Sequence, residues 1–260
     1  MKVFHHFLWG LKFYPEAVGF IFKNRLAKFF IFPVLLNIVY YFSVGVLISK
    51  FTHYIMNYID MEFIQSVEAE WIKSVLEIGV AIALHILLWM LSIFIGGQVV
   101  LAMMSPVLAY LSEKTEQILK GTDYPFNLKQ FLKDVLRGIG IALYNLYKEI
   151  VYMIVVFIVS FIPVIGFLSP VFGFIISAYF FGFSFVDYVN ERKKLSVKQS
   201  IKVSDSIKGL VVAHGVLFAL MMMIPVIGST LAGFISIIST VAATLSMLSL
   251  PEYEKLVAKR

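Results

Sequence analysis

Few side chains of this 260-residue sequence could do chemistry inside an apolar segment. Each of these side chains lacks a second reactive group nearby in the sequence. His85, His214, Asn37 and Gln98 each interrupt a long apolar stretch without a second ionisable group in that stretch. An enzyme acting within a membrane normally carries paired carboxylates or a His-Glu-x-x-His zinc motif in its helices, and neither pattern occurs. A lone polar residue more often bonds to a neighbouring helix. The sequence therefore predicts no catalytic residues and no enzyme.

The adjacent His5 and His6 are the nearest approach to a metal-ligand pair, and we interpret them as polar residues on a helix surface. The absence of cysteine excludes disulfides, thiolate nucleophiles and Cys-ligated metals. A Gly-x-x-x-x-Gly-Lys-Ser/Thr loop for ATP is also absent. We therefore expect no metal site and no cofactor.

Two glycines could place backbone donors for an anion. Gly166 and Gly228 each end the same pentapeptide, Ile-Pro-Val-Ile-Gly, which makes an internal repeat. A helix that starts after each glycine would present unpaired N–H groups and a partial positive charge, as the broken helices of transporters do. Ser229 and Thr230 add hydroxyl donors at the second break. The alternative is that Gly and Pro only turn the chain.

Hydroxyl side chains recur along one helical face after the second glycine. Ser236, Thr240 and Thr244 are spaced by four residues and therefore share a face. They line either a polar path or a close-packing seam, because small residues let helices approach each other in lipid. We favour packing, with any hydroxyl-lined pore formed by helix assembly.

A third cationic feature precedes the first apolar stretch. Arg25 and Lys28 stand beside Asn24 immediately before that stretch. Lys and Arg at this place are typical of a cytoplasmic anchor. An anion-binding entry site is the alternative, and one pair of residues could serve both purposes.

The elements that must position these residues are membrane helices. Hydrophobic residues make up 60 % of the chain and charged residues 15 %, with a mean hydropathy of +0.89. A soluble domain averages about 45–50 % apolar and about 25 % charged residues. No charge occurs over residues 29–49, 78–112, 150–186 or 209–251. Each run is long enough to enter a bilayer, so we expect a single integral membrane domain over residues 1–260.

The distribution of Lys and Arg predicts the topology, although the net charge of +6 by itself does not. The N-terminal segment, residues 105–149, residues 187–208 and the C-terminal tail are basic, whereas residues 50–77 are acidic. We therefore expect cytoplasmic termini, an external segment at 50–77, and transmembrane helices over 29–50 and 75–104.

The two remaining apolar runs lie between cytoplasmic segments, so residues 150–186 and 209–250 are predicted to be helical hairpins that enter and leave by the same face. Arms over 150–162 and 171–186 would be about 20 Å and 24 Å long at 1.5 Å per residue. Both are shorter than the ~30 Å hydrocarbon core, which favours a re-entrant first hairpin. For the second hairpin, spanning and re-entrant arrangements both remain open.

Amphipathic helices complete the expected all-α fold. Apolar residues recur at helical spacing over residues 2–24, which predicts an interfacial helix. Ser105-Pro106 offers an N-cap and first-turn pair for another helix, and residues 127–149 form a third. We expect residues 105–149 to be cytoplasmic amphipathic helices that lead into the first hairpin.

Short motifs spread over the chain resemble the CysZ-type sulfate permeases, the bacterial branch of the etoposide-induced-protein superfamily. They are the basic tract before Phe32-Pro33-Val34-Leu35-Leu36-Asn37-Ile38, Ser105-Pro106-Val107-Leu108, Leu111-Ser112-Glu113-Lys114-Thr115-Glu116, Asp134-Val135-Leu136-Arg137, Phe161-Ile162-Pro163-Val164-Ile165-Gly166 through Pro170, Asp187-Tyr188 and Met223-Ile224-Pro225. Their order and spacing together carry the resemblance.

The resemblance implies two long transmembrane helices and two hemi-penetrating hairpins in a homo-oligomer that brings sulfate into the cytoplasm for cysteine biosynthesis. In that family an Arg pair before the first spanning helix is associated with sulfate. The matching positions here hold Ala27 and Lys28, with Arg25 two residues earlier. A compact ammonium does not reproduce the planar two-pronged donor of Arg.

We interpret the chain as an all-α polytopic protein of the bacterial inner membrane that takes up an oxyanion, sulfate above all, by a channel-like or permease mechanism. Its expected partners are the oxyanion, the lipid bilayer and further copies of itself, with no nucleic acid. The alternative is a membrane scaffold or lipid-interacting protein of the same superfamily that transports nothing. An intramembrane enzyme has the least support.

Overall fold

The computed structural model describes residues 2–58, 69–121, 128–224 and 227–258, and within them it contains helices and no strand. The all-α prediction is therefore confirmed. In chain order the elements are α1 (Lys2–Lys23), η1 (Leu26–Phe30), α2 (Ile31–Tyr58), α4 (Glu70–Lys120), α5 (Leu128–Ser160), η2 (Ile165–Leu168), α6 (Ser169–Arg192), α7 (Val197–Ser206), α8 (Lys208–Met222), α9 (Gly228–Leu248) and α10 (Pro251–Ala258).

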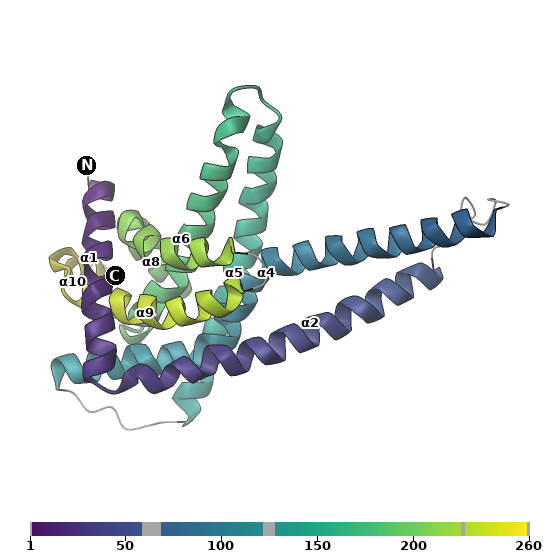
Figure 1. Cartoon of the computed structure of the whole chain (residues 1–260). Coiled ribbons are helices and arrows are strands. Elements are labelled where there is room, and N and C mark those ends of the chain that lie inside the picture. Colours follow the sequence, from purple (N-terminus) through teal and green to yellow (C-terminus); the bar gives the residue numbers. More distant parts are fainter. Residues whose placement is uncertain (1, 59–68, 122–127, 225–226, 259–260) are drawn as a thin grey trace.

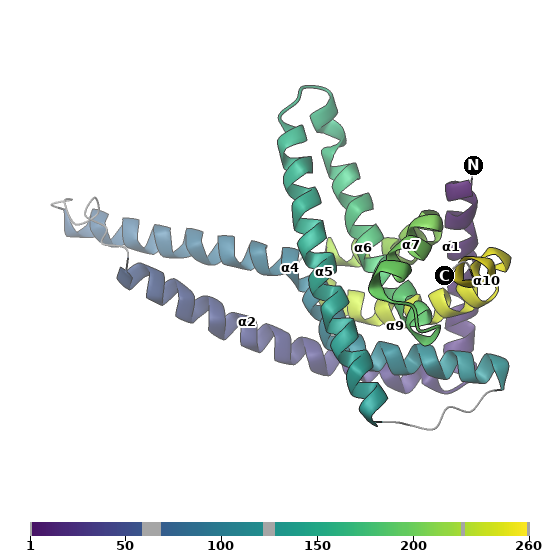
Figure 2. The same cartoon turned by 180° about the vertical axis from the view of Figure 1, so that it is seen from behind.

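The molecule consists of a packed body and two helical arms. Helices α2 and α4 form one arm, and α5 and α6 form the other, which points in a different direction (Figures 1 and 2). The body gathers α1, α8 and α9 together with parts of α4 and α6. Helix α9 contacts α1, α2, α4, α6 and α8, and therefore lies at the centre of the packing.

Several helices of the described chain are long and apolar enough to cross a membrane, which makes the protein a polytopic membrane protein. The single segments with sufficient length and hydropathy are Leu26–Asn57, Glu70–Ile93, Leu136–Ser160, Ile165–Arg192 and Gly228–Leu248. Helices α7 and α8 satisfy it only as a pair, bent by 95° at their junction.

Helices α6 and α8 cross in close backbone contact at two glycines. A methyl group built on Gly215 would overlap the carbonyl oxygen of Ala178, and one built on Gly182 would overlap that of Val211. Without side chains at these positions the two backbones touch, as small residues allow in membrane helices. Next to the crossing, the rings of Phe181 and Phe218 pack with centroids 4.7 Å apart. Helices α6 and α8 together form the surface on which α1 and α9 pack.

Helix α1 agrees with the helix predicted over residues 2–24 to within one residue, and it is packed into the body. Its buried residues, which include Phe13, Ala17 and Ile21, pack against α8 and α9. Phe4 and Phe22, both from the predicted apolar face, remain more than 60 % exposed. The helix therefore joins the body by one face and presents apolar side chains on another.

Two predicted boundaries are wrong. Ser105-Pro106 begins no helix, because both residues lie inside the 51-residue helix α4. Proline removes one backbone hydrogen bond there, but Leu101, Met104 and Leu108 are buried in the core around it. Tertiary packing thus overrides the local start signal. Likewise, the predicted helix over 127–149 and the predicted hairpin arm over 150–162 are one continuous helix, α5. Charged residues stop at position 150, but this change in composition does not interrupt the helical backbone.

The first hairpin is consequently longer than its uncharged run. Segments Leu136–Ser160 and Ile165–Arg192 have 25 and 28 residues, so both arms are long enough to cross the membrane. The depth to which this hairpin enters the bilayer stays a prediction. The bounds of the second predicted hairpin, residues 209–250, agree with the start of α8 and the end of α9 to within two residues. Pro225, Val226, part of the predicted external segment 50–77 and the side chain of Gln98 lie outside what the structure describes.

Candidate functional site

A buried line of hydroxyl groups runs along α9. Ser236, Thr240 and Thr244 are all fully buried, and each hydroxyl donates to a carbonyl one turn earlier in the helix, at 2.7–2.8 Å. Such back-bonding satisfies a hydroxyl without a partner from another helix. We call the line from Ser229 to Thr244 the α9 seam. Within a single chain its middle part packs against other helices, as the spacing favours.

The N-terminal end of the seam meets α2. Ser229 donates to Asn37 Oδ1 at 2.8 Å and bonds to the Tyr41 hydroxyl at 2.6 Å. Asn37 in turn donates to the carbonyl of Pro33. Gly228 is buried at the first position of α9, while Thr230 is half-buried. The structure therefore brings together Asn37 and Ser229, which the sequence suggested separately.

A small cavity adjoins this end of the seam. Its lining includes Tyr40, Tyr41, Trp89, Ser92 and Ser229, and its volume is about 20 Å³. That is room for roughly one water molecule. A hydrated oxyanion does not fit, so the arrangement in this structure is closed at the N-terminus of α9.

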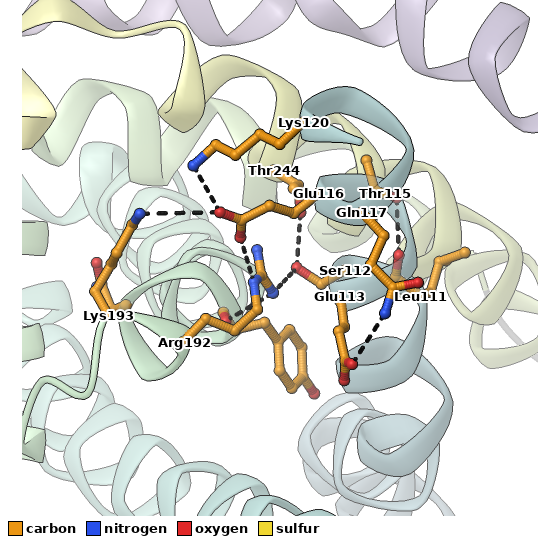
Figure 3. Close-up of polar contacts among 12 residues, drawn as sticks. Leu111, Ser112, Glu113, Thr115, Glu116, Gln117, Lys120, Arg192, Lys193 and Thr244 are labelled. Atoms are coloured by element: carbon orange, nitrogen blue, oxygen red, sulfur yellow. Dashed lines mark hydrogen bonds and ion pairs between the residues drawn. The ribbon is translucent and has the colours of Figure 1, made fainter. Parts of the chain in front are cut away.

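The C-terminal end of the seam meets an ion cluster (Figure 3). Thr244 and Ser112 share a hydrogen bond of 2.7 Å, and Arg192 Nη1 donates to Ser112 at 2.7 Å. Arg192 Nε also donates to Glu116 Oε2 at 2.6 Å. Since an arginine only donates, the Ser112 hydroxyl accepts from Arg192 and donates its own hydrogen bond to Thr244 Oγ1, and Thr244 donates to the Thr240 carbonyl. Hydrogen bonds thus connect the guanidinium to the seam.

Glu116 is the centre of this cluster and is nearly inaccessible. Besides Arg192, it contacts Lys120 at 2.8 Å and Lys193 at 3.8 Å. Burial by itself would raise the pKa of Glu116, but the charge of Arg192 and the hydrogen bonds from Lys120 and Arg192 outweigh it, and the pKa lies below its ordinary value. Burial lowers the pKa of Lys193, with the Glu116 charge opposing the change.

A second ion group lies earlier in α6, before Arg192. Arg137 of α5 donates to both carboxylate oxygens of Asp187, at 2.9 and 3.2 Å, and Ser200 of α7 donates to the same carboxylate. Glu191 lies 3.7 Å from Arg137. These contacts tie α5, α6 and α7 together. They also gather residues of motifs that are far apart in the sequence.

The three predicted entry residues lie apart from the seam, on the turn between α1 and α2. Asn24 donates to the Phe20 carbonyl at the end of α1, and Arg25 adopts a left-handed conformation with φ of 57°. Arg25 and Lys28 are exposed, and neither forms an ion pair with any residue that the structure describes. Lys28 instead lies over the Phe29 ring, 5.6 Å from its centroid.

Gly166 lies at the tip of the other arm and not at the start of a long helix. Its N–H donates to the Ile162 carbonyl, and η2 separates it from the first residue of α6, Ser169. The tip packs on α5 and α6, away from the centre where α9 lies (Figure 1). The two repeated glycines are therefore not brought to one site.

Sequence reasoning missed the roles of Arg192 and Glu116. A signal existed, because Ser112, Glu116 and Lys120 recur every four residues and so share one face of a helix. The partner Arg192 follows 76 residues later and has no local signal. His85 and His214 do bond across helices, to Thr52 at 3.1 Å and to Ser246 at 2.8 Å respectively.

Comparison with known families agrees with the motifs. A family model described as "Sulfate transporter CysZ/Etoposide-induced protein 2.4" matches residues 14–232, which is most of the chain. The chain belongs to this family. The match confirms the resemblance and includes Asn37, the ion cluster and the first residues of the seam.

Proposed function

We propose that this protein is an anion transporter of the inner membrane whose substrate is sulfate, taken up for cysteine biosynthesis by a channel-like or permease mechanism. The observation that supports the proposal most is the α9 seam. It links a polar group at α2 to an ion cluster rich in cations through buried hydroxyls. Membership of a family described as "Sulfate transporter CysZ/Etoposide-induced protein 2.4" supports sulfate as the substrate.

The chemistry of the seam suits an anion. Hydroxyl groups and the amide of Asn37 can turn donors toward an oxyanion, and the α9 N-terminus carries partial positive charge. Arg25 and Lys28, exposed on the α1–α2 turn, would attract the anion where its path meets the cytoplasmic water. Passage requires α9 to separate from its neighbours, because the seam hydroxyls bond to their own helix and the cavity at Ser229 is small.

Assembly and orientation belong to the same proposal. Apolar side chains of the segment Glu70–Ile93, such as Ile78, Ile82 and Leu87, are more than half exposed and are therefore available to lipid or to another copy of the chain. We propose a homo-oligomer with both termini in the cytoplasm, as the basic segments favour.

Uptake of radiolabelled sulfate into proteoliposomes tests the function. We expect saturable uptake that unlabelled sulfate inhibits more strongly than chloride does. The R25A/K28A variant should take up sulfate more slowly at low sulfate concentration. Thr240→Val should reduce uptake severalfold, because it removes a seam hydroxyl at constant shape. Thr52→Val, the same change on α2 outside the seam, is the matched control. No uptake by folded, inserted protein would favour a scaffold or lipid-interacting role instead.

A further inference from the structure

A groove at the base of the α5–α6 arm joins an apolar surface to a charged one. Its volume is about 500 Å³, which lies within the range usual for a small-molecule site. Side chains of α5 and α6 line one part of the groove, and side chains of α1, α7 and α8 line the rest. Figure 2 shows α7 beside α6 where the arm meets the body. The groove therefore lies between the arm and the body.

The groove spans the point at which charge ends along α5. Glu149 is the last charged residue before the uncharged run of residues 150–186. Lys148 lines the groove just ahead of this run, and Tyr152 and Ile175 line it from within the run. Lysine and tyrosine at such a boundary are typical of the level at which lipid headgroups meet the hydrocarbon. One end of the groove is therefore suited to a headgroup and the other to an acyl chain.

The charged end brings together two lysines and one carboxylate. Lys148 comes from α5 and Lys208 from α8, while Asp205 belongs to α7. Asp205 already has partners within the protein, because Lys208 lies 3.7 Å from it and the Tyr179 hydroxyl donates to it at 2.9 Å. The Lys148 ammonium lies over the Tyr144 ring, 5.9 Å from its centroid, and pairs with no carboxylate of the described residues. Two positive charges against one negative charge make this end complementary to a phosphodiester.

The apolar end is open to the surface of the arm. Ile175 is 46 % exposed and Tyr152 is 50 % exposed, whereas Phe180 and Phe183 line the groove from buried positions. An acyl chain can therefore cover exposed apolar surface without entering the core, and such burial is favourable. Lys208 and Asp205 are about half exposed, so a headgroup bound near them would stay in contact with water.

We propose that this groove binds one molecule of an anionic phospholipid, phosphatidylglycerol, whose phosphate contacts Lys148 and Lys208 and whose acyl chain lies along Ile175 and Ile176. Charge complementarity selects an anionic lipid over a zwitterionic one, because the lysines outnumber the carboxylate. The lipid would contact both α5 and α8 and so hold the arm against the body. The inference is separate from the proposed transport, since the groove shares no residue with the α9 seam.

Native mass spectrometry of the purified full chain, freed of lipid in detergent, tests the site. Phosphatidylglycerol should bind severalfold more tightly than phosphatidylcholine with the same acyl chains. Lys148→Gln should weaken binding of phosphatidylglycerol about fivefold and leave phosphatidylcholine unaffected, because only the anionic lipid gains from the lysine charge. Lys133→Gln, the same change at an exposed position of α5 outside the groove, is the matched control. Equal affinity for the two lipids, or equal effects of the two substitutions, would overturn the proposal.

The apolar half of the site has its own test. Ile176→Trp fills the groove without a change of charge and should weaken binding of phosphatidylglycerol severalfold, whereas Ile158→Trp on the exposed face of α5 should not. Glycerol 3-phosphate, which has the phosphate without the chains, should fail to displace the lipid. Displacement by glycerol 3-phosphate as effective as displacement by the lipid would overturn a lipid site in favour of a free phosphate ester.

Thermal unfolding separates lipid binding from a merely structural role of Lys148. Without lipid, Lys148→Gln should melt at the same temperature as the unmodified protein, because Lys148 forms no ion pair with the described residues. Phosphatidylglycerol should raise the melting temperature of the unmodified protein more than that of the variant, since a ligand stabilises the state that binds it. Equal increases in both proteins would overturn the site.

Discussion

Tyr14 illustrates how single polar residues anchor helices in this protein. Its hydroxyl donates to the His214 carbonyl at 2.9 Å and bonds to Ser239 at 2.9 Å, so one side chain of α1 reaches both α8 and α9. Burial raises its pKa well above the ordinary value, with the bond from Ser239 opposing the shift. Tyr14 therefore acts as a neutral hydrogen-bonding group that fixes α1 to the body.

At the residue scale, Glu116 makes stability depend on pH. Its pKa is lower in the folded protein than the ordinary value of 4.5. A lowered carboxyl pKa contributes stability that is complete above the unfolded value and disappears as pH falls through the folded one. We expect the melting temperature in detergent to decrease as the pH falls below about 4.5, and the decrease to be smaller in Glu116→Gln.

Differential scanning fluorimetry over a series of pH values measures both slopes. Glu113→Gln should retain the slope of the unmodified protein. An unchanged slope in Glu116→Gln would assign the acid sensitivity to other carboxylates.

At the element scale, the stability of the body depends on close backbone contact between α6 and α8. Gly215→Ala would force the Ala178 carbonyl and the backbone of Gly182 away from α8. Overpacking of this kind costs about 1–3 kcal/mol, and more where backbone must move. We expect a melting temperature several degrees lower, measured by fluorimetry in detergent.

Gly19→Ala on α1 is the matched control, because a methyl group there meets nothing within 4 Å. Alanine also favours the helix over glycine by about 1 kcal/mol. This variant should therefore be as stable as the unmodified protein or slightly more so. Similar losses in both variants would mean that the α6–α8 crossing is looser than the structure indicates.

At the scale of the whole molecule, the first and last helices of the described chain, α1 and α10, lie together. His6 Nε2 is 3.5 Å from Glu252 Oε2, so α1 and α10 are on the same side of the body, whereas the far ends of α2 and α4 extend away from it (Figure 2). We expect Lys2→Cys and Lys255→Cys to react with a membrane-impermeant maleimide from one face of the membrane, and Glu70→Cys from the other.

The protein has no cysteine, so each introduced thiol is its only one. Labelling in right-side-out and inverted vesicles assigns the face of each position. Reaction of Glu70→Cys from the same face as Lys2→Cys would exclude a crossing by the α2–α4 arm.

The sequence by itself determined the class of the molecule, its helical content, the outer bounds of α8 and α9, and the shared face of Ser236, Thr240 and Thr244. These features follow from hydropathy and helical periodicity, which are local properties. Tertiary structure decided which faces meet: that Ser229 reaches Asn37, that α1 is packed against α8 and α9, and that α4 continues through Pro106. It also decided that Arg192 meets Glu116, because that pairing joins residues 76 positions apart and leaves no periodic trace in the chain.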